Sequence, residues 1–219
     1  MIIKGALNMS TKLLDLEDQR RDAILNAALK EFVSRGFDKA STNVIAKDAG
    51  ISKALMFHYV SSKQELFLFV YDYFTELLNK EYFAKLDFSQ KDIFARLRQS
   101  YLLQIELIQQ YPWITEFRKL SLLTNSDELN KAIQERAKKD QPSCDLQIFN
   151  MIDVSKFRPG LDIEKCKEFI LWVNIGFINK ILDDIRNSEA LHLDYDHIVS
   201  TLDGYFDELR KIFYMSSNE

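Results

Sequence analysis

An apolar pattern of helical period constrains this chain more than its other sequence features. The pattern begins near Leu16 and recurs to the end of the chain. Its spacing places apolar side chains on one face of a helix. Glycine occurs six times and proline three times, whereas a sheet-rich fold of this length needs many tight turns. The sequence therefore predicts an all-α fold of long helices.

Capping and helix-breaking residues divide this pattern. Ser41 or Thr42 stands where a helix N-cap belongs, Ser52 caps a second short helix after Gly50, and Ser62 with Glu65 forms a capping box. These two short helices flank Gly50. We expect the other helices over 18–34, 63–83, 90–110, 113–123, 126–140, 143–153, 162–187 and 195–214.

The two short helices around Gly50 have the features of a helix-turn-helix. Small residues, Ala46 and Ala49, permit close approach of the two helices, and Gly50 can take the left-handed conformation of the turn. Ile45 and Ile51 would face a small core. This pattern is typical of proteins that place the second helix in the major groove of DNA.

Residues 20–67 resemble the DNA-binding domain of the TetR family. The resemblance rests on Gly36-Phe37, Ser41-Thr42, Ile45-Ala46, Ala49 to Lys53, Phe57 to Tyr59 and Ser62 to Phe67. It implies a three-helix helix-turn-helix domain, with its N-terminal extension, over residues 1–67. A larger helical domain for ligand binding and dimerisation would follow over residues 68–219.

The resemblance also implies which residues contact DNA. Thr42 would hold a phosphate, Lys53 would enter the major groove, and Lys63 would meet a phosphate across the groove, whereas His58 and Tyr59 would contact the backbone. The full predicted set is Thr42, Ser52, Lys53, Ala54, Leu55, Phe57, His58, Tyr59 and Lys63.

Several residues depart from the family pattern. Ala54 replaces a usual glycine, Phe57 a usual tyrosine and Val60 a usual phenylalanine. Leu55 replaces an often polar residue and could contact a thymine methyl group. These departures leave the exact DNA contacts open.

The two last helices are apolar on more than one face, which indicates burial against a second subunit. The resemblance also implies that the last two helices form a four-helix dimer interface. We expect the interface at Phe169, Val173, Phe177, Ile181, Leu202, Phe206, Leu209 and Phe213. The alternative is a monomeric core that uses both faces.

Aromatic residues are dense between the two predicted parts. These residues could line a cavity. The resemblance to the TetR family implies that such a cavity holds a small apolar or amphipathic effector. The candidate lining residues are Tyr101, Tyr111, Trp113, Phe117, Phe149, Phe169 and Trp172. For each of them an ordinary place in the core is the alternative.

The charge distribution and the few cysteine and histidine residues limit the classes of function that fit the chain. Residues 1–68 carry ten Lys/Arg and eight Asp/Glu, a net +2, while residues 69–219 carry a net −6. Only the N-terminal part suits a polyanion. Cys144 and Cys166 have no metal-binding spacing. His192 and His197, near Asp194 and Asp196, fit a solvated turn better than a metal site.

We find no pattern for catalysis and expect no enzyme, cofactor or metal. The longest uncharged run, Phe169–Asn179, has eleven residues, short of the roughly 18 that cross a membrane. We therefore expect a cytoplasmic protein without a membrane partner, whose start is either Met1 or Met9.

The sequence thus predicts a homodimeric, ligand-responsive regulator that binds a palindromic double-stranded operator, with repression as the expected mode. The alternative is a helical carrier or enzyme that keeps the helix-turn-helix as scaffold without binding DNA.

Overall fold

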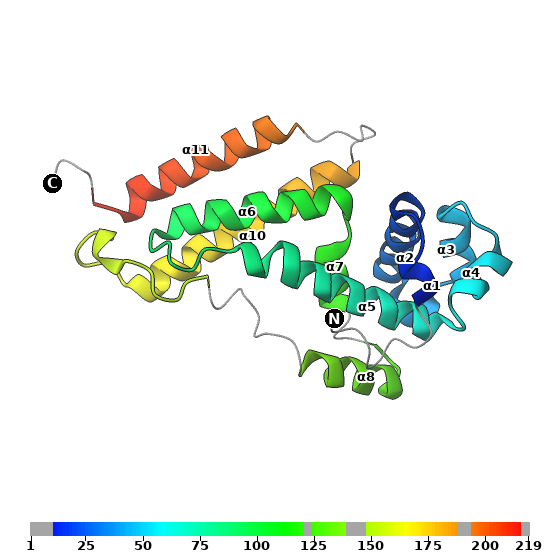
Figure 1. The fold of residues 1–219 in the computed structure, drawn as a ribbon. Helices are drawn as coiled ribbons and strands as arrows, with labels where there is room; N and C mark the ends of the chain where they lie inside the picture. The colour runs from blue at the N-terminus through cyan, green and yellow to red at the C-terminus, as the bar shows by residue number, and fades with distance from the viewer. Residues whose placement is uncertain (1–10, 121–123, 139–147, 188–193, 216–219) are drawn as a thin grey trace. The chain divides into compact units, whose positions relative to one another are not determined.

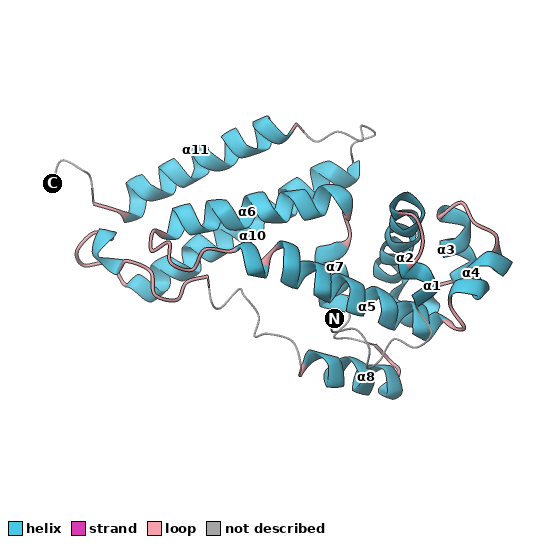
Figure 2. Ribbon diagram, in the orientation of Figure 1, coloured by secondary structure: helices cyan, strands magenta, loops and turns pink. Residues whose placement is uncertain are grey.

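The computed structural model describes residues 11–120, 124–138, 148–187 and 194–215. Within these residues the chain is helical and has no strands, which confirms the predicted all-α fold (Figures 1 and 2). The chain divides into two compact units, Met1–Asn79 with Trp113–Gln141, and Lys80–Pro112 with Pro142–Glu219.

The first unit contains the predicted helix-turn-helix. Its helices are α1 (Thr11–Leu14), α2 (Asp18–Lys39), α3 (Thr42–Asp48), α4 (Lys53–Tyr59), most of α5 (Lys63–Glu81), α7 (Ile114–Leu120) and α8 (Asp127–Ala137). Within α2, Gly36 has φ 70° and ψ 162°, so the helical path breaks there before one further turn. This break lies where the sequence predicted the helix to stop.

An aromatic cluster explains why α7 belongs to this first unit. The ring centroid of Phe67 on α5 lies 4.9 Å from that of Phe32 on α2, 5.3 Å from that of Phe37 and 5.1 Å from that of Phe117 on α7. Edge contacts of this kind add to the stabilisation from apolar burial. The unit therefore extends beyond the predicted boundary at residue 67 and includes a segment distant in sequence.

The second unit packs three long helices around one core. Its elements are η1 (Phe83–Lys85), α6 (Ile93–Gln110), η2 (Val154–Lys156), α10 (Ile163–Asn187) and α11 (Tyr195–Phe213). Phe94, Tyr101, Ile170, Phe177 and Phe206 lie in this core. Buried polar groups there are paired, since the Tyr101 hydroxyl donates to Asn174 Oδ1 at 2.8 Å.

The predicted helices agree with the structure to within a few residues at most ends. The exception is the helix expected over 143–153. Residues 143–147 lie outside the described residues, and residues 148–151 form a turn in which Met151 has φ 54°. A turn with positive φ at a non-glycine residue is incompatible with a continuing helix.

Candidate nucleic-acid interface

The turn between α3 and α4 is built by backbone hydrogen bonds around Gly50. The N–H of Gly50 donates to Lys47 O at 3.0 Å, and the N–H of Ile51 donates to Ala46 O at 2.9 Å. This pair of bonds is the Schellman ending of a helix, which needs a left-handed residue. Gly50 supplies it with φ 68°. The glycine assigned from sequence therefore has the predicted conformation.

The helix α4 presents one side to solvent and buries the other. Lys53, Ala54, Phe57 and His58 are exposed, and Ser52 Oγ accepts from the N–H of Leu55 at 3.1 Å as an N-cap. The Phe57 ring is 43% exposed although it is apolar. The exposed side combines a cation, a histidine and an aromatic ring, and this composition suits contact with a DNA groove.

Two other predicted DNA-contact residues are placed differently. Tyr59 is 8% exposed, so its ring belongs to the core of the unit rather than to the exposed side of α4. Leu55 is half-buried. Position 59 follows Met56 by three residues, and residues three apart share one helix face. Because Met56 is buried, this spacing indicates that Tyr59 is buried as well.

The N-terminus of α3 is capped from another helix. Ser41 is the N-cap residue, but its side chain makes no capping bond. Instead Glu31 Oε1 on α2 accepts from the backbone N–H of Ser41 at 2.9 Å. Thr42, the predicted phosphate ligand, is half-buried at the first position of α3.

Lys63 lies against the end of α2. Its Nζ donates to Asp38 O at 2.9 Å and to Ala40 O at 3.1 Å, and it lies 4.8 Å from the centroid of the Phe37 ring. The ammonium group has three donors, so these two bonds leave one for a phosphate. Lys63 therefore holds α5 against α2 whatever else it contacts.

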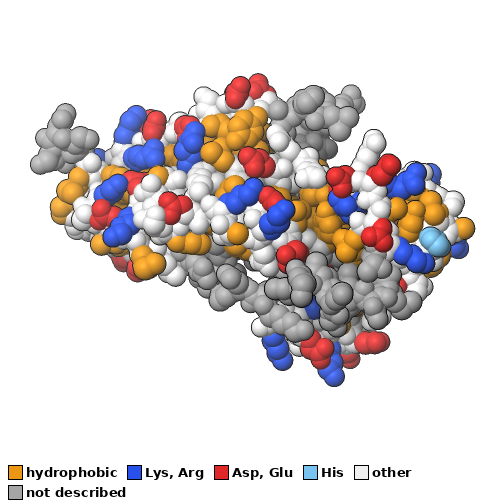
Figure 3. All heavy atoms as spheres, in the orientation of Figure 1, with side chains coloured by type: hydrophobic (Ala, Val, Ile, Leu, Met, Phe, Trp, Pro, Cys, Tyr) orange, Lys and Arg blue, Asp and Glu red, His pale blue; other side chains and the backbone are white. Residues whose placement is uncertain are grey.

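Cationic side chains from outside the two short helices also reach this surface. Lys12 Nζ on α1 donates to His58 O at 3.1 Å, at the C-terminal end of α4. Figure 3 shows Lys and Arg side chains gathered with hydrophobic ones over α3 and α4. Sequence reasoning missed Lys12 because it lies 46 residues before its partner.

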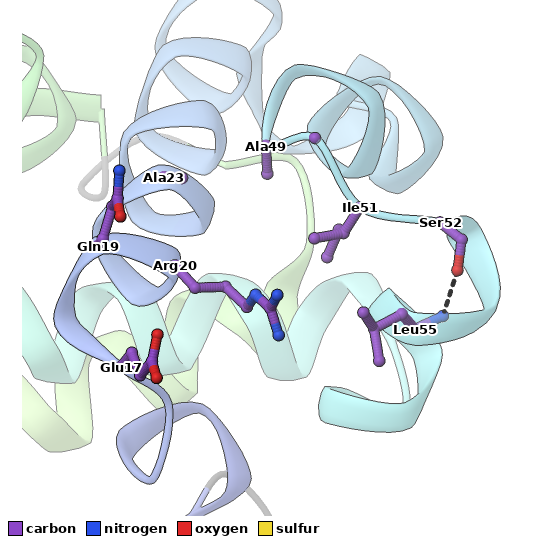
Figure 4. A pocket seen from close by; sticks show the side chains of 9 residues that line it. Glu17, Gln19, Arg20, Ala23, Ala49, Ile51, Ser52 and Leu55 are labelled. Atoms are coloured by element: carbon purple, nitrogen blue, oxygen red, sulfur yellow. Dashed lines mark hydrogen bonds between the residues drawn. The ribbon is translucent and has the colours of Figure 1, made fainter.

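A groove of about 400 Å³ runs beside the N-terminal end of α4. The start of α2 lines one wall, and the α3–α4 turn with the start of α4 lines the other (Figure 4). The lining residues are Glu17, Gln19, Arg20, Ala23, Ala49, Gly50, Ile51, Ser52 and Leu55. Ser52 and Leu55 belong to the predicted DNA-contact set, whereas Arg20 was not predicted.

Comparison with known proteins identifies the domain that carries this geometry. Residues 24–75 match the family described as bacterial regulatory proteins, tetR family. These residues therefore form a DNA-binding domain of the TetR family type. The matched residues begin in α2, include all of α3 and α4, and end in α5.

Curated relatives resemble this chain over about a quarter of its length. The transcriptional activator FasR of Mycolicibacterium smegmatis is 45% identical over 53 residues, which are 24% of each chain. The transcriptional regulator BetI of Agrobacterium fabrum is 40% identical over 55 residues, 25% of this chain and 27% of BetI. The chain thus matches about a quarter of each of these curated relatives.

Two solved structures resemble the fold over most of the chain. The ketosteroid transcriptional regulator KstR2 of Mycobacterium tuberculosis has a TM-score of 0.60 and 19% identity, and the match covers 92% of this chain and 97% of KstR2. AibR, in complex with isovaleryl coenzyme A and operator DNA, has a TM-score of 0.52 and 20% identity, with 86% and 97% covered. At these identities the likeness shows the shared fold.

The residues predicted to line an effector pocket lie in both units. Trp113 and Phe117 belong to the first unit, and the other five belong to the second. Tyr101, Tyr111 and Phe117 are buried, Trp113 and Phe149 are half-buried, and Phe169 and Trp172 are exposed. Burial raises the pKa of Tyr101, so its hydroxyl stays neutral and donates to Asn174. The two exposed residues are placed on the surface of their unit rather than in its core.

The predicted dimer-interface residues fall into two groups. Phe169 and Val173 on α10 are 48% and 43% exposed. The others are at most 9% exposed within their own unit, namely Phe177, Ile181, Leu202, Phe206, Leu209 and Phe213. These six side chains pack α10 and α11 onto α6 instead of facing outward. The apolar residues that α10 and α11 do expose also include Trp172, Ile175, Tyr205 and Ile212.

Among the described residues, no group of three His, Cys, Asp or Glu side chains could hold a metal ion. His192 lies outside these residues; the carboxylate of its neighbour Asp194 accepts from the N–H of His197 as the N-cap of α11. No helix in the described part is both long and apolar enough to span a bilayer.

Proposed function

We propose that this TetR-family chain is a transcription regulator that binds double-stranded operator DNA through α4. The exposed side of α4 carries the proposal, because it presents Lys53, Ala54, Phe57 and His58 while Met56 and Tyr59 fix the helix to its unit. A short helix anchored on one face and exposed on the other can enter the major groove without losing its own packing.

We further propose that the regulator acts as a homodimer. The exposed apolar side chains of α10, Phe169, Trp172, Val173 and Ile175, are the sites we assign to the partner contact. Contiguous exposed apolar surface is typical of subunit interfaces. A two-fold dimer presents two copies of α4 to half-sites roughly 34–36 Å apart, which accounts for a palindromic operator.

The regulator is proposed to respond to a small apolar or amphipathic effector. Two observations support this part: the dense buried aromatic residues, and the fold shared with AibR, whose structure contains isovaleryl coenzyme A together with operator DNA. We expect effector binding to favour a state in which the two copies of α4 no longer match the operator. Repression is our proposed mode, although the relative FasR is named an activator.

The decisive experiment measures DNA binding of the full chain over a salt series. The probes are the upstream region of its own gene and an unrelated fragment of equal length. We expect preferential binding to the first, with an affinity that falls steeply as salt rises. Lys53→Glu should abolish binding with little effect on stability, since Lys53 is exposed and loses only a contact at 5.9 Å with the exposed Phe57 ring, which is worth little at such a site. Absence of binding at low salt would favour a carrier or enzyme that retains the fold.

A further inference from the structure

Arg20 and Arg21 are neighbours on α2 with different surroundings. The Arg21 guanidinium donates to Asp18 Oδ1 and lies 5.9 Å from the centroid of the Tyr73 ring. Arg20 is exposed and, within the described part of the chain, its side chain forms no ion pair or hydrogen bond. One arginine therefore stabilises the unit, whereas the charge of the other remains available.

The position of Arg20 places that charge in the groove beside the start of α4. Figure 4 shows its side chain extending from α2 across the groove toward Ile51 and Leu55, at the start of α4. Ser52 and Leu55 line the same groove and lie at the end of α4 that would enter DNA first. A duplex seated on α4 would therefore bring its backbone past the mouth of this groove.

From this arrangement we propose that Arg20 binds a backbone phosphate of the operator beside the N-terminal end of α4. The inference rests on the proposed DNA-binding function. A guanidinium suits a phosphate because its planar donors can form two parallel hydrogen bonds to the phosphate oxygens. Such a contact positions the protein on DNA and carries no sequence information.

Glu17 provides a second, opposite charge in the same groove. Its carboxylate belongs to the residue that precedes α2, and Figure 4 shows it set apart from the guanidinium of Arg20. If DNA passes along the groove, Glu17 repels the same phosphate that Arg20 attracts. Removal of the Arg20 charge should therefore lower DNA affinity, whereas removal of the Glu17 charge should raise it. Loss of folding would not produce effects of opposite sign.

The test compares the salt dependence of operator binding in wild type, Arg20→Ala, Arg20→Lys and Glu17→Gln, using the full chain. A dimer carries two copies of Arg20, so Arg20→Ala should reduce the slope of log affinity against log salt by about 1.8. Its affinity should fall about tenfold at low salt, equally for operator and unrelated DNA. Arg20→Lys should keep most of the slope, and Glu17→Gln should bind about twofold tighter.

The control is Lys30→Ala, which removes an exposed charge from the same helix about 15 Å further along its axis. It should leave both slope and affinity unchanged. A wild-type slope in Arg20→Ala, or a loss confined to the operator, would overturn the phosphate contact while leaving DNA binding intact. If wild type itself ignores DNA, the proposed function fails first, and this inference fails with it.

Discussion

The ammonium group of Lys63 lies 2.9 Å from the backbone carbonyl of Asp38, near the C-terminal end of α2. Carbonyl groups at a helix end lack partners within the helix and attract cations. Lys63 therefore satisfies the end of α2 and joins it to α5. A lysine that sequence reasoning assigned to a phosphate has a structural role that needs no DNA.

We predict that Lys63→Met lowers the free energy of unfolding by about 1 kcal/mol, because it removes a charged donor from helix-end carbonyls. Urea unfolding followed by circular dichroism measures this change. Lys47→Met serves as control, since Lys47 is exposed on α3. Equal stability of Lys63→Met and wild type would contradict the structural role and leave Lys63 to DNA alone.

Gly50 gives a prediction about the turn. An added Cβ meets no atom within 4 Å, so Gly50→Ala creates no clash. The cost is conformational, because an L-residue at φ 68° is strained. We expect Gly50→Ala to lower the free energy of unfolding by about 1–2 kcal/mol. Gly204→Ala, in the middle of α11 with the same free space, should instead stabilise the chain, and a loss of equal size in both variants would refute the argument.

The turn at Gly50 was predictable from sequence because a local pattern determines it. Helix periodicity likewise located α10 and α11, since their apolar residues recur over many turns. The sequence could not show which apolar face turns inward. Phe206 and Tyr205 are adjacent aromatic residues on α11, yet one is 1% exposed and the other 45%. Packing against α6 makes that choice, and it depends on residues a hundred positions away.

At the candidate DNA surface, too, local sequence patterns did not show which distant residues come together. The residues at the start of α4 followed from the motif. Lys12, which bonds to the end of α4, and Arg20, which lines the groove beside it, come from preceding helices. The burial of Arg96 was equally hidden, because an arginine in a helix is ordinarily exposed. These are long-range relationships that no local spacing encodes.

Arg96 joins two loops at the end of the second unit. It is 0% exposed, and its guanidinium donates to the carbonyls of Ile148 at 2.9 Å, Asn150 at 2.6 Å, Phe88 at 3.1 Å and Gln90 at 2.8 Å. Burial lowers the pKa of Arg96. The carbonyl groups of both loops depend on this one side chain for their hydrogen bonds.

We predict that Arg96→Met lowers the free energy of unfolding by about 3 kcal/mol, because several carbonyls would be left without donors. Arg96→Lys should also destabilise the chain, since an ammonium lacks the width of the guanidinium fork. Denaturant unfolding measures both. Arg158→Met is the comparison: Arg158 donates to Tyr214 O and Lys211 O in more exposed surroundings, so its loss should cost less. The reverse order would refute the role of burial.

The surroundings of the Asp92 carboxylate indicate that the free energy of unfolding depends on pH. Burial by itself raises the pKa of its carboxyl, but the ammonium of Lys156 at 2.7 Å and the N–H groups at the start of α6 outweigh burial and hold that pKa below its usual value. A carboxyl whose pKa is depressed by folding stabilises the folded state above the unfolded pKa, about 3.9 for Asp. That contribution is lost as pH falls through the folded pKa.

We therefore expect the stability difference between wild type and Asp92→Asn to be largest near neutral pH and to shrink below about pH 4. Unfolding by urea at a series of pH values gives this difference directly. Asp184→Asn, which alters an exposed carboxylate on α10, should show no such trend. A constant difference between wild type and Asp92→Asn at all pH values would show that the carboxylate charge does not stabilise the fold.

The exposed face of α10 predicts the oligomeric state. Trp172 is 59% exposed, and its ring centroid lies 5.7 Å from that of Phe169, which is also exposed. Burial of these rings against a second copy would stabilise the dimer, and a charge placed there would be costly to bury. Trp172→Glu should therefore yield a monomer in sedimentation equilibrium, with thermal stability measured alongside.

Met151→Glu introduces the same charge at an apolar side chain that is 77% exposed elsewhere in the second unit, and it should remain dimeric. Because a palindromic operator needs both copies of α4, the monomer should bind it far more weakly. A dimeric Trp172→Glu variant would move the interface away from this face of α10.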